Sequence, residues 1–117
     1  MRPRIVLPSA AALWREGGFT LPLNFQDPPA RFLVSDAGGA EFDHEPTEAE
    51  TVAFVRAHWG KLAAPGTYFG GWRNPEGRHF LDVTRAHADR SAALAAGRQN
   101  RQFAIFDVEA GESIPVE

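Results

Sequence analysis

The turn Asn74-Pro75-Glu76-Gly77 places the strongest constraint on what this chain can fold into. Asn74 can hydrogen-bond its own backbone, Pro75 presets φ for a type I turn, and Gly77 can take a positive φ. A type I turn followed by a glycine with positive φ forms the three-residue loop of a β-hairpin. The turn therefore predicts a hairpin over residues 66–84 in which Asn74 lies opposite Arg78.

This register assigns the side chains of the hairpin to two faces, because successive residues of a strand point in opposite directions. Phe69, Leu81 and Val83 share one face, which we expect to lie in the core. On the other face the predicted cross-strand pairs are Trp72 with Phe80, Gly70 with Asp82, and Tyr68 with Thr84.

Two interpretations of this second face remain open. In the first, another layer of the protein covers it, and Asp82 and Thr84 bond a neighbouring loop or a helix N-terminus. In the second, glycines permit close approach and aromatic rings supply contact area for a ligand or partner. The binding residues would then be Tyr68, Trp72, Phe80, Asp82 and Thr84.

One helix is predicted before the hairpin and one after it. Thr47 and Glu50 fit a capping box at the start of a long helix over about residues 47–63. The apolar residues of this segment fall on one helical face: Val52, Val55, Trp59 and Leu62. An alanine-rich helix over about residues 89–99 follows the hairpin, with Asp89 or Ser91 as its N-cap.

Strand composition marks residues 31–35, 40–44 and 102–108, and residues 18–25 can form an edge strand despite Pro22. The order of elements predicts an α+β fold, with a mainly antiparallel sheet of four or five strands and both helices packed on it. The strand–helix–strand connection over residues 78–108 can place the last strand parallel to the preceding strand. We expect one domain over residues 1–117, with an acidic, loosely held tail at 109–117.

Composition narrows the classes of function. The chain has no cysteine, which excludes disulfides and thiolate metal sites and is compatible with the cytoplasm. The net charge is −3, and residues 67–108 contain six arginines and four acidic residues, so this segment is only slightly basic. A dedicated nucleic-acid binder is therefore disfavoured. Residues 1–7 match neither a signal peptide nor a membrane span.

The four histidines lack any ligand spacing, so we expect no metal and no cofactor, and we expect His79 and His87 to face solvent. An alternative is a small metal-independent enzyme acting on RNA or nucleotides. Its catalytic groups would lie at the hairpin end: His79, Arg73, Arg78 and Glu76. The acids between Glu41 and Glu50 form either a solvated edge or a surface for a basic partner.

Four stretches carry a resemblance to known proteins: residues 68–72 (YFGGW), 80–83 (FLDV), 89–94 (DRSAAL) and 102–107 (QFAIFD). This pattern resembles small, largely uncharacterised bacterial and phage-associated proteins. The resemblance implies that these segments form one unit, and it implies no activity.

The sequence therefore predicts a small cytoplasmic protein-interaction or accessory protein that is not an enzyme and has a protein partner. The resemblance suggests an association with phage or mobile-element functions. Nothing in the sequence sets an oligomeric state.

Overall fold

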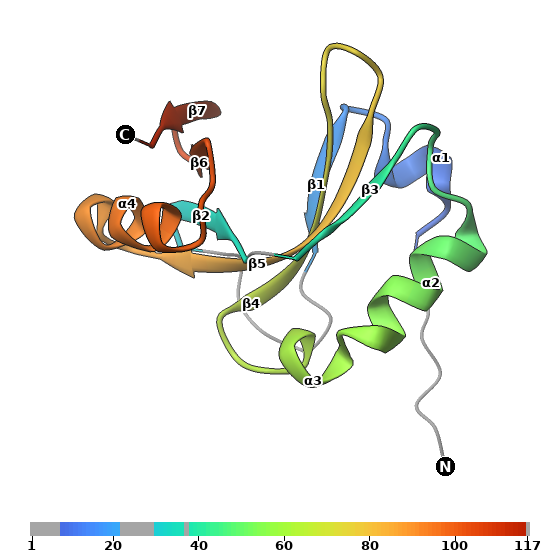
Figure 1. Ribbon diagram of the computed structural model, residues 1–117, viewed down its shortest axis with the longest axis horizontal. Coiled ribbons are helices and arrows are strands. Elements are labelled where there is room, and N and C mark those ends of the chain that lie inside the picture. Colours follow the sequence, from blue (N-terminus) through green and yellow to red (C-terminus); the bar gives the residue numbers. More distant parts are fainter. Residues whose placement is uncertain (1–7, 22–29, 37, 117) are drawn as a thin grey trace.

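A computed structural model describes residues 8–21, 30–36 and 38–116. Within these residues seven strands form one sheet, in the order β1-β4-β5-β2-β6-β7, and β3 pairs with a separate part of β5. The strands are β1 (Gly18–Leu21), β2 (Phe32–Ser35), β3 (Ala40–Phe42), β4 (Thr67–Arg73), β5 (His79–His87), β6 (Ala104–Asp107) and β7 (Glu112–Pro115). The helices are α1 (Ala10–Leu13), α2 (Glu48–Ala57), α3 (Trp59–Leu62) and α4 (Arg90–Gln99). The sheet curls into a half-barrel (Figure 1).

The predicted hairpin register is confirmed. Trp72 pairs with Phe80, and the same register continues along β4 and β5 to Thr67 and Arg85. In the turn, the Asn74 N–H donates to the Arg78 carbonyl at 2.9 Å, and Gly77 has a φ of 84°. The local turn chemistry is therefore sufficient to set the register of the longest ladder in the sheet.

The predicted fold, with four or five strands and a long helix over residues 47–63, is wrong. The helical segment is interrupted at His58, whose φ of −110° and ψ of 13° end α2 before α3 begins. Both the backbone N–H and the ring Nδ1 of His58 bond the Phe54 carbonyl, at 3.1 and 2.9 Å. A side chain that bonds its own helix in this way competes with continuation of the backbone ladder. The α2 start is nevertheless a complete capping box of Thr47 and Glu50.

The strand count exceeds the prediction because two short edge strands complete the sheet. β1 corresponds to the first part of the edge strand predicted over residues 18–25, and it pairs with β4; residues 22–25 lie outside the described residues. β7 pairs with β6 in the segment for which the sequence suggested a loosely held tail. The ladders within the described ranges are all antiparallel. β6 runs parallel to β5, but β2 lies between them and is antiparallel to both.

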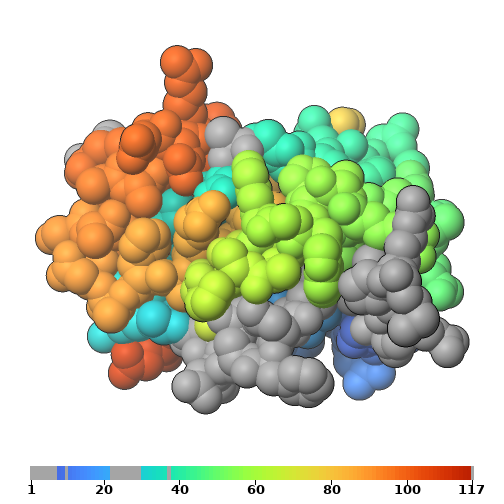
Figure 2. Space-filling model, turned by 90° about the horizontal axis from the view of Figure 1, so that it is seen from below, coloured from blue at the N-terminus to red at the C-terminus, as the bar shows by residue number. Residues whose placement is uncertain are grey.

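Two hydrophobic clusters lie on one face of the sheet, beneath different helices. Around the β4–β5 hairpin, α1, α2 and α3 contribute to a cluster of Leu13, Trp14, Phe54, Val55, Leu62, Phe69, Leu81 and Val83. Beneath α4 lies a second cluster of Phe32, Val34, Ala93 and Ile105. In Figure 2, α2 and α3 (green) and α4 (orange) occupy different halves of the view. The alanine-rich helix approaches closely, since a Cβ on Gly97 would lie 2.9 Å from Val116 and 3.1 Å from Ile105.

A membrane-crossing helix, which would have to be both long and apolar, does not occur in the described ranges.

Candidate functional site

The second face of the hairpin, defined above by Tyr68, Trp72, Phe80, Asp82 and Thr84, divides into an exposed part and a buried part. Trp72 is 54% exposed, and its ring stacks on that of Phe80, with centroids 5.5 Å apart and planes 27° apart. Phe80 is half-buried, whereas Tyr68 and Thr84 are buried. The accessible contact area at this site is therefore the Trp72–Phe80 stack.

Asp82 lies next to this stack and is largely withdrawn from water. Burial raises the pKa of the Asp82 carboxyl to about 6, against the opposing effect of a hydrogen bond with Ser35. The β2–β3 connection closes over it, because a Cβ placed on Gly39 would collide with Asp82 Oδ1 and lie 2.7 Å from the Leu81 carbonyl. Asp82 is thus a perturbed carboxyl held beneath a glycine.

The alternative catalytic set is divided between core and surface, although Arg73 and His79 are cross-strand partners. The expectation that His79 faces solvent is wrong, since its ring is buried and packs edge-on against Trp14 with centroids 4.8 Å apart. Neither ring nitrogen of His79 has a hydrogen-bond partner among the residues that the structure describes. Arg78 instead pairs with Glu41 at 2.7 Å, while Arg73 and Glu76 are exposed. Of these four residues, only His79 reaches the core.

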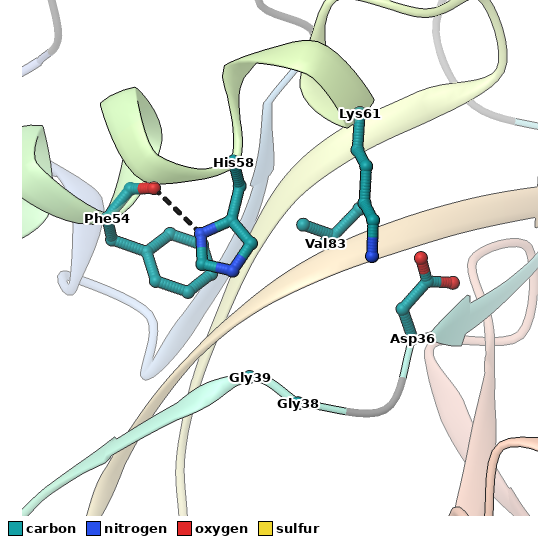
Figure 3. A pocket seen from close by; sticks show the side chains of 7 residues that line it. All are labelled: Asp36, Gly38, Gly39, Phe54, His58, Lys61 and Val83. Carbon is teal, nitrogen blue, oxygen red and sulfur yellow. Dashed lines mark hydrogen bonds between the residues drawn. The ribbon is translucent and has the colours of Figure 1, made fainter.

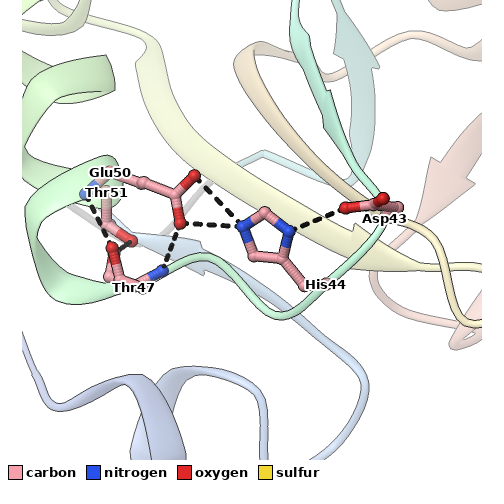
Figure 4. A network of polar contacts seen from close by, with 5 residues as sticks. All are labelled: Asp43, His44, Thr47, Glu50 and Thr51. Carbon is pink, nitrogen blue, oxygen red and sulfur yellow. Dashed lines mark hydrogen bonds and ion pairs between the residues drawn. The ribbon is translucent and has the colours of Figure 1, made fainter.

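The acidic stretch is organised around His44 (Figure 4). Its Nδ1 lies 2.8 Å from Asp43 Oδ1 and its Nε2 lies 2.9 Å from Glu50 Oε1. The hydrogen bonds with Asp43 and Glu50 raise the pKa of His44. Glu50 also accepts the Thr47 N–H, so the network fixes the start of α2. Asp43 and Glu50 therefore have a structural role at the solvent-exposed start of α2.

A pocket of about 220 Å³ opens on the helix-covered face of the sheet (Figure 3). Its lining comes from three separated segments: Asp36, Gly38, Gly39, Phe54, His58, Lys61 and Val83. The sequence does not point to this site, because Asp36, Gly38 and Gly39 lie between two predicted strands and His58 lies within the helix predicted over residues 47–63. The spacing of His58 and Lys61, three residues apart in a helical segment, is the one local signal that could have drawn attention to it.

Across the described ranges, no group of three His, Asp or Glu side chains is arranged to hold a metal ion. No protein-family model matches the chain, and no curated protein or solved structure is detectably similar to it.

Proposed function

We propose that this chain is a small cytoplasmic interaction protein that binds a protein partner through the Trp72–Phe80 stack. The observation that carries the proposal is the exposure of Trp72 beside a ring that already holds it in place. A stacked, pre-oriented aromatic pair offers contact area with little further loss of side-chain freedom on binding. The suggested association with phage or mobile-element functions rests on the sequence resemblance.

The charges around the stack favour a partner surface with basic side chains. Glu41 lies directly across from Phe80 in the β3–β5 ladder, and Asp43 follows with a side chain that is 81% exposed. Arg78 pairs with Glu41, and His44 pairs with Asp43 and Glu50, so the further negative charge at this edge comes from the exposed Glu45 and Glu48. A lysine or arginine can then meet the open ring face of Trp72 while an acid lies nearby.

Site-specific photo-crosslinking tests this proposal in cells that produce the protein. A photoreactive phenylalanine analogue replaces Trp72 in one variant and Phe103 in the matched control, because Phe103 is 96% exposed. We expect a discrete protein adduct from position 72 that position 103 does not give. The adduct should weaken at high salt and in a Glu41→Gln background, since the partner is held partly by charge.

Equal adducts from both positions would contradict the proposal, because exposure alone would then explain them. An adduct at position 72 that neither salt nor Glu41→Gln affects would exclude the basic partner. Once the partner is identified, Trp72→Ala should weaken its affinity at least about tenfold, as expected for an aromatic anchor.

A further inference from the structure

Lys61 lines the pocket between α3 and the β2–β3 connection. It is the single lysine of this chain, and the remaining basic side chains other than histidine are arginines. Figure 3 shows the Lys61 ammonium directed across the pocket toward Asp36. In the part of the chain that the structure describes, no acid lies within ion-pair distance of Lys61. This cation is therefore available to a ligand.

His58 presents a defined hydrogen-bond acceptor to the same pocket. Its Nδ1 must donate to the Phe54 carbonyl, 2.9 Å away, because a carbonyl oxygen only accepts. In the neutral imidazole, Nε2 then carries the lone pair. The ring is held flat against Phe54, with centroids 4.1 Å apart, and Nε2 has no partner among the described residues.

The negative charge in the lining is already paired. Arg85 Nε lies 3.0 Å from Asp36 Oδ1, and Arg85 Nη2 lies 3.2 Å from Asp36 Oδ2. Lys61 therefore gives the site a net positive charge. The remaining walls are apolar or lack side chains, being formed by Phe54, Val83 and the two glycines. The volume corresponds to roughly seven water molecules, which suits a compact ligand.

We propose that this pocket binds a compact anion that carries a hydrogen-bond donor next to its anionic oxygens. A small 2-hydroxy acid and a hydrogen phosphate group share this chemistry. The anionic oxygens bind the Lys61 ammonium, the ligand hydroxyl donates to His58 Nε2, and any carbon lies against Phe54 and Val83. This site lies on the helix-covered face, away from the Trp72–Phe80 stack, so it does not depend on the proposed protein partner.

The single lysine makes the test direct, because its acetylation is resolved from that of the N-terminal amine by mass spectrometry. Two matched pairs of probes differ mainly in the donor: lactate against propionate, and inorganic phosphate against sulfate. At about ten times its Kd, a bound probe should slow acetylation of Lys61 about elevenfold. We expect lactate or phosphate to protect Lys61 more than its donor-free counterpart, with the N-terminal amine unaffected.

A second readout uses the imidazole proton resonances. The protecting probe should shift the Hε1 signal of His58 and leave that of His44 in place, since both nitrogens of His44 are already bonded to carboxylates. His58→Asn retains a donor for the Phe54 carbonyl but places no acceptor at the position of Nε2, because the asparagine side chain is shorter. This variant should lose the preference for lactate or phosphate over its counterpart.

Arg56→Gln is the matched control for charge, since it removes an exposed cation from α2 outside the pocket lining. It should leave protection unchanged, whereas Lys61→Gln should abolish the shift of His58. The proposal is overturned if the probes protect both amines alike, if donor-free anions protect equally well, or if no probe protects Lys61. Circular dichroism of each variant establishes that it is folded.

Discussion

At the scale of single residues, Asp82 and Gly39 form one packing unit. The glycine lets the β2–β3 connection lie against the carboxyl, and burial beneath this connection raises the pKa of Asp82 to about 6. A carboxyl that retains its proton more strongly in the native state than in the unfolded state makes stability fall as pH rises between the two pKa values. Both residues therefore yield predictions with a defined sign.

Asp82→Asn should raise stability at neutral pH. The pKa in the unfolded chain is near 3.8 and that in the native state is about 6, so the cost of the ionised carboxyl is absent below about pH 4 and complete above about pH 7. The substitution should stabilise the protein by up to about 3 kcal/mol at neutral pH and by much less near pH 4. Urea unfolding at both pH values measures this difference, and an equal effect at both would refute the account.

Gly39→Ala and Gly60→Ala should have opposite effects. A methyl group at position 39 collides with Asp82 and the Leu81 carbonyl, so we expect a loss of about 1–3 kcal/mol. A methyl group at position 60, in α3, meets nothing within 4 Å and should stabilise by about 0.5–1 kcal/mol. Chemical unfolding of the two variants beside the wild type gives both values. Two changes of the same sign would show that contact at Gly39 does not control its role.

At the scale of elements, the break between α2 and α3 places two pocket side chains. His58 ends α2, and Lys61 lies on the short helix that follows, so both contribute to one wall. The other end of α2 is fixed by the capping box and by His44. The regular spacing of the apolar residues Val52, Val55, Trp59 and Leu62 predicts one continuous helix, because hydrophobic periodicity indicates only which side chains are buried. It carries no information on the hydrogen bond between the His58 side chain and the Phe54 carbonyl, at which the helix is interrupted.

The His44 network should make the stability of α2 depend on pH. Hydrogen bonds to Asp43 and Glu50 raise the pKa of His44 above the reference value of 6.5. The pKa values of Asp43 and Glu50 are lowered. The stabilisation is therefore complete below the unfolded-state pKa, down to the acid range where the carboxylates protonate. It is lost as pH rises through the native-state pKa of His44. His44→Gln should lower the Tm more at about pH 5.5 than at about pH 8.5.

Thermal unfolding of wild type and His44→Gln across this range provides the measurement, with Glu48→Gln as a control in the same helical turn. A Tm difference that grows toward alkaline pH would contradict the assignment.

At the scale of the whole molecule, two hydrophobic clusters share a single sheet. β5 pairs with β4 over most of its length, with β3 near its start and with β2 near its end, so it connects the two halves. Trp14, Trp59 and Trp72 all belong to the half around the hairpin, whereas α4 covers the other half. Tryptophan fluorescence thus reports on one half, and far-ultraviolet circular dichroism reports on both.

Ile105→Ala should destabilise the whole protein, although no tryptophan lies in its cluster. Ile105 is 2% exposed, and truncation of such a side chain costs about 2–5 kcal/mol. Because β5 spans both halves, the fluorescence and dichroism transitions in urea should shift together. Separation of the two transitions would show that the halves unfold independently.

Local chemistry explains which parts were predictable from the sequence. The turn at Asn74 sets the β4–β5 register, and Thr47 with Glu50 sets the start of α2, since both depend on neighbouring residues alone. The pocket could not be predicted, because Asp36, His58 and Val83 meet only through the folded chain. The burial of His79 was implied by the register, which places it on the face of Leu81 and Val83.

Within the described residues, the edge strands of the half-barrel are short, which limits aggregation through strand addition. β1 and β7 end the sheet with four residues each, and β3 has three. Pro115 ends β7, and the charged Glu41 and Glu112 lie within these strands. Short edge strands offer few unpaired backbone groups to a strand of another molecule, which disfavours edge-to-edge association of sheets. On the function proposed above, a partner would have to be recognised through side chains such as the exposed indole of Trp72.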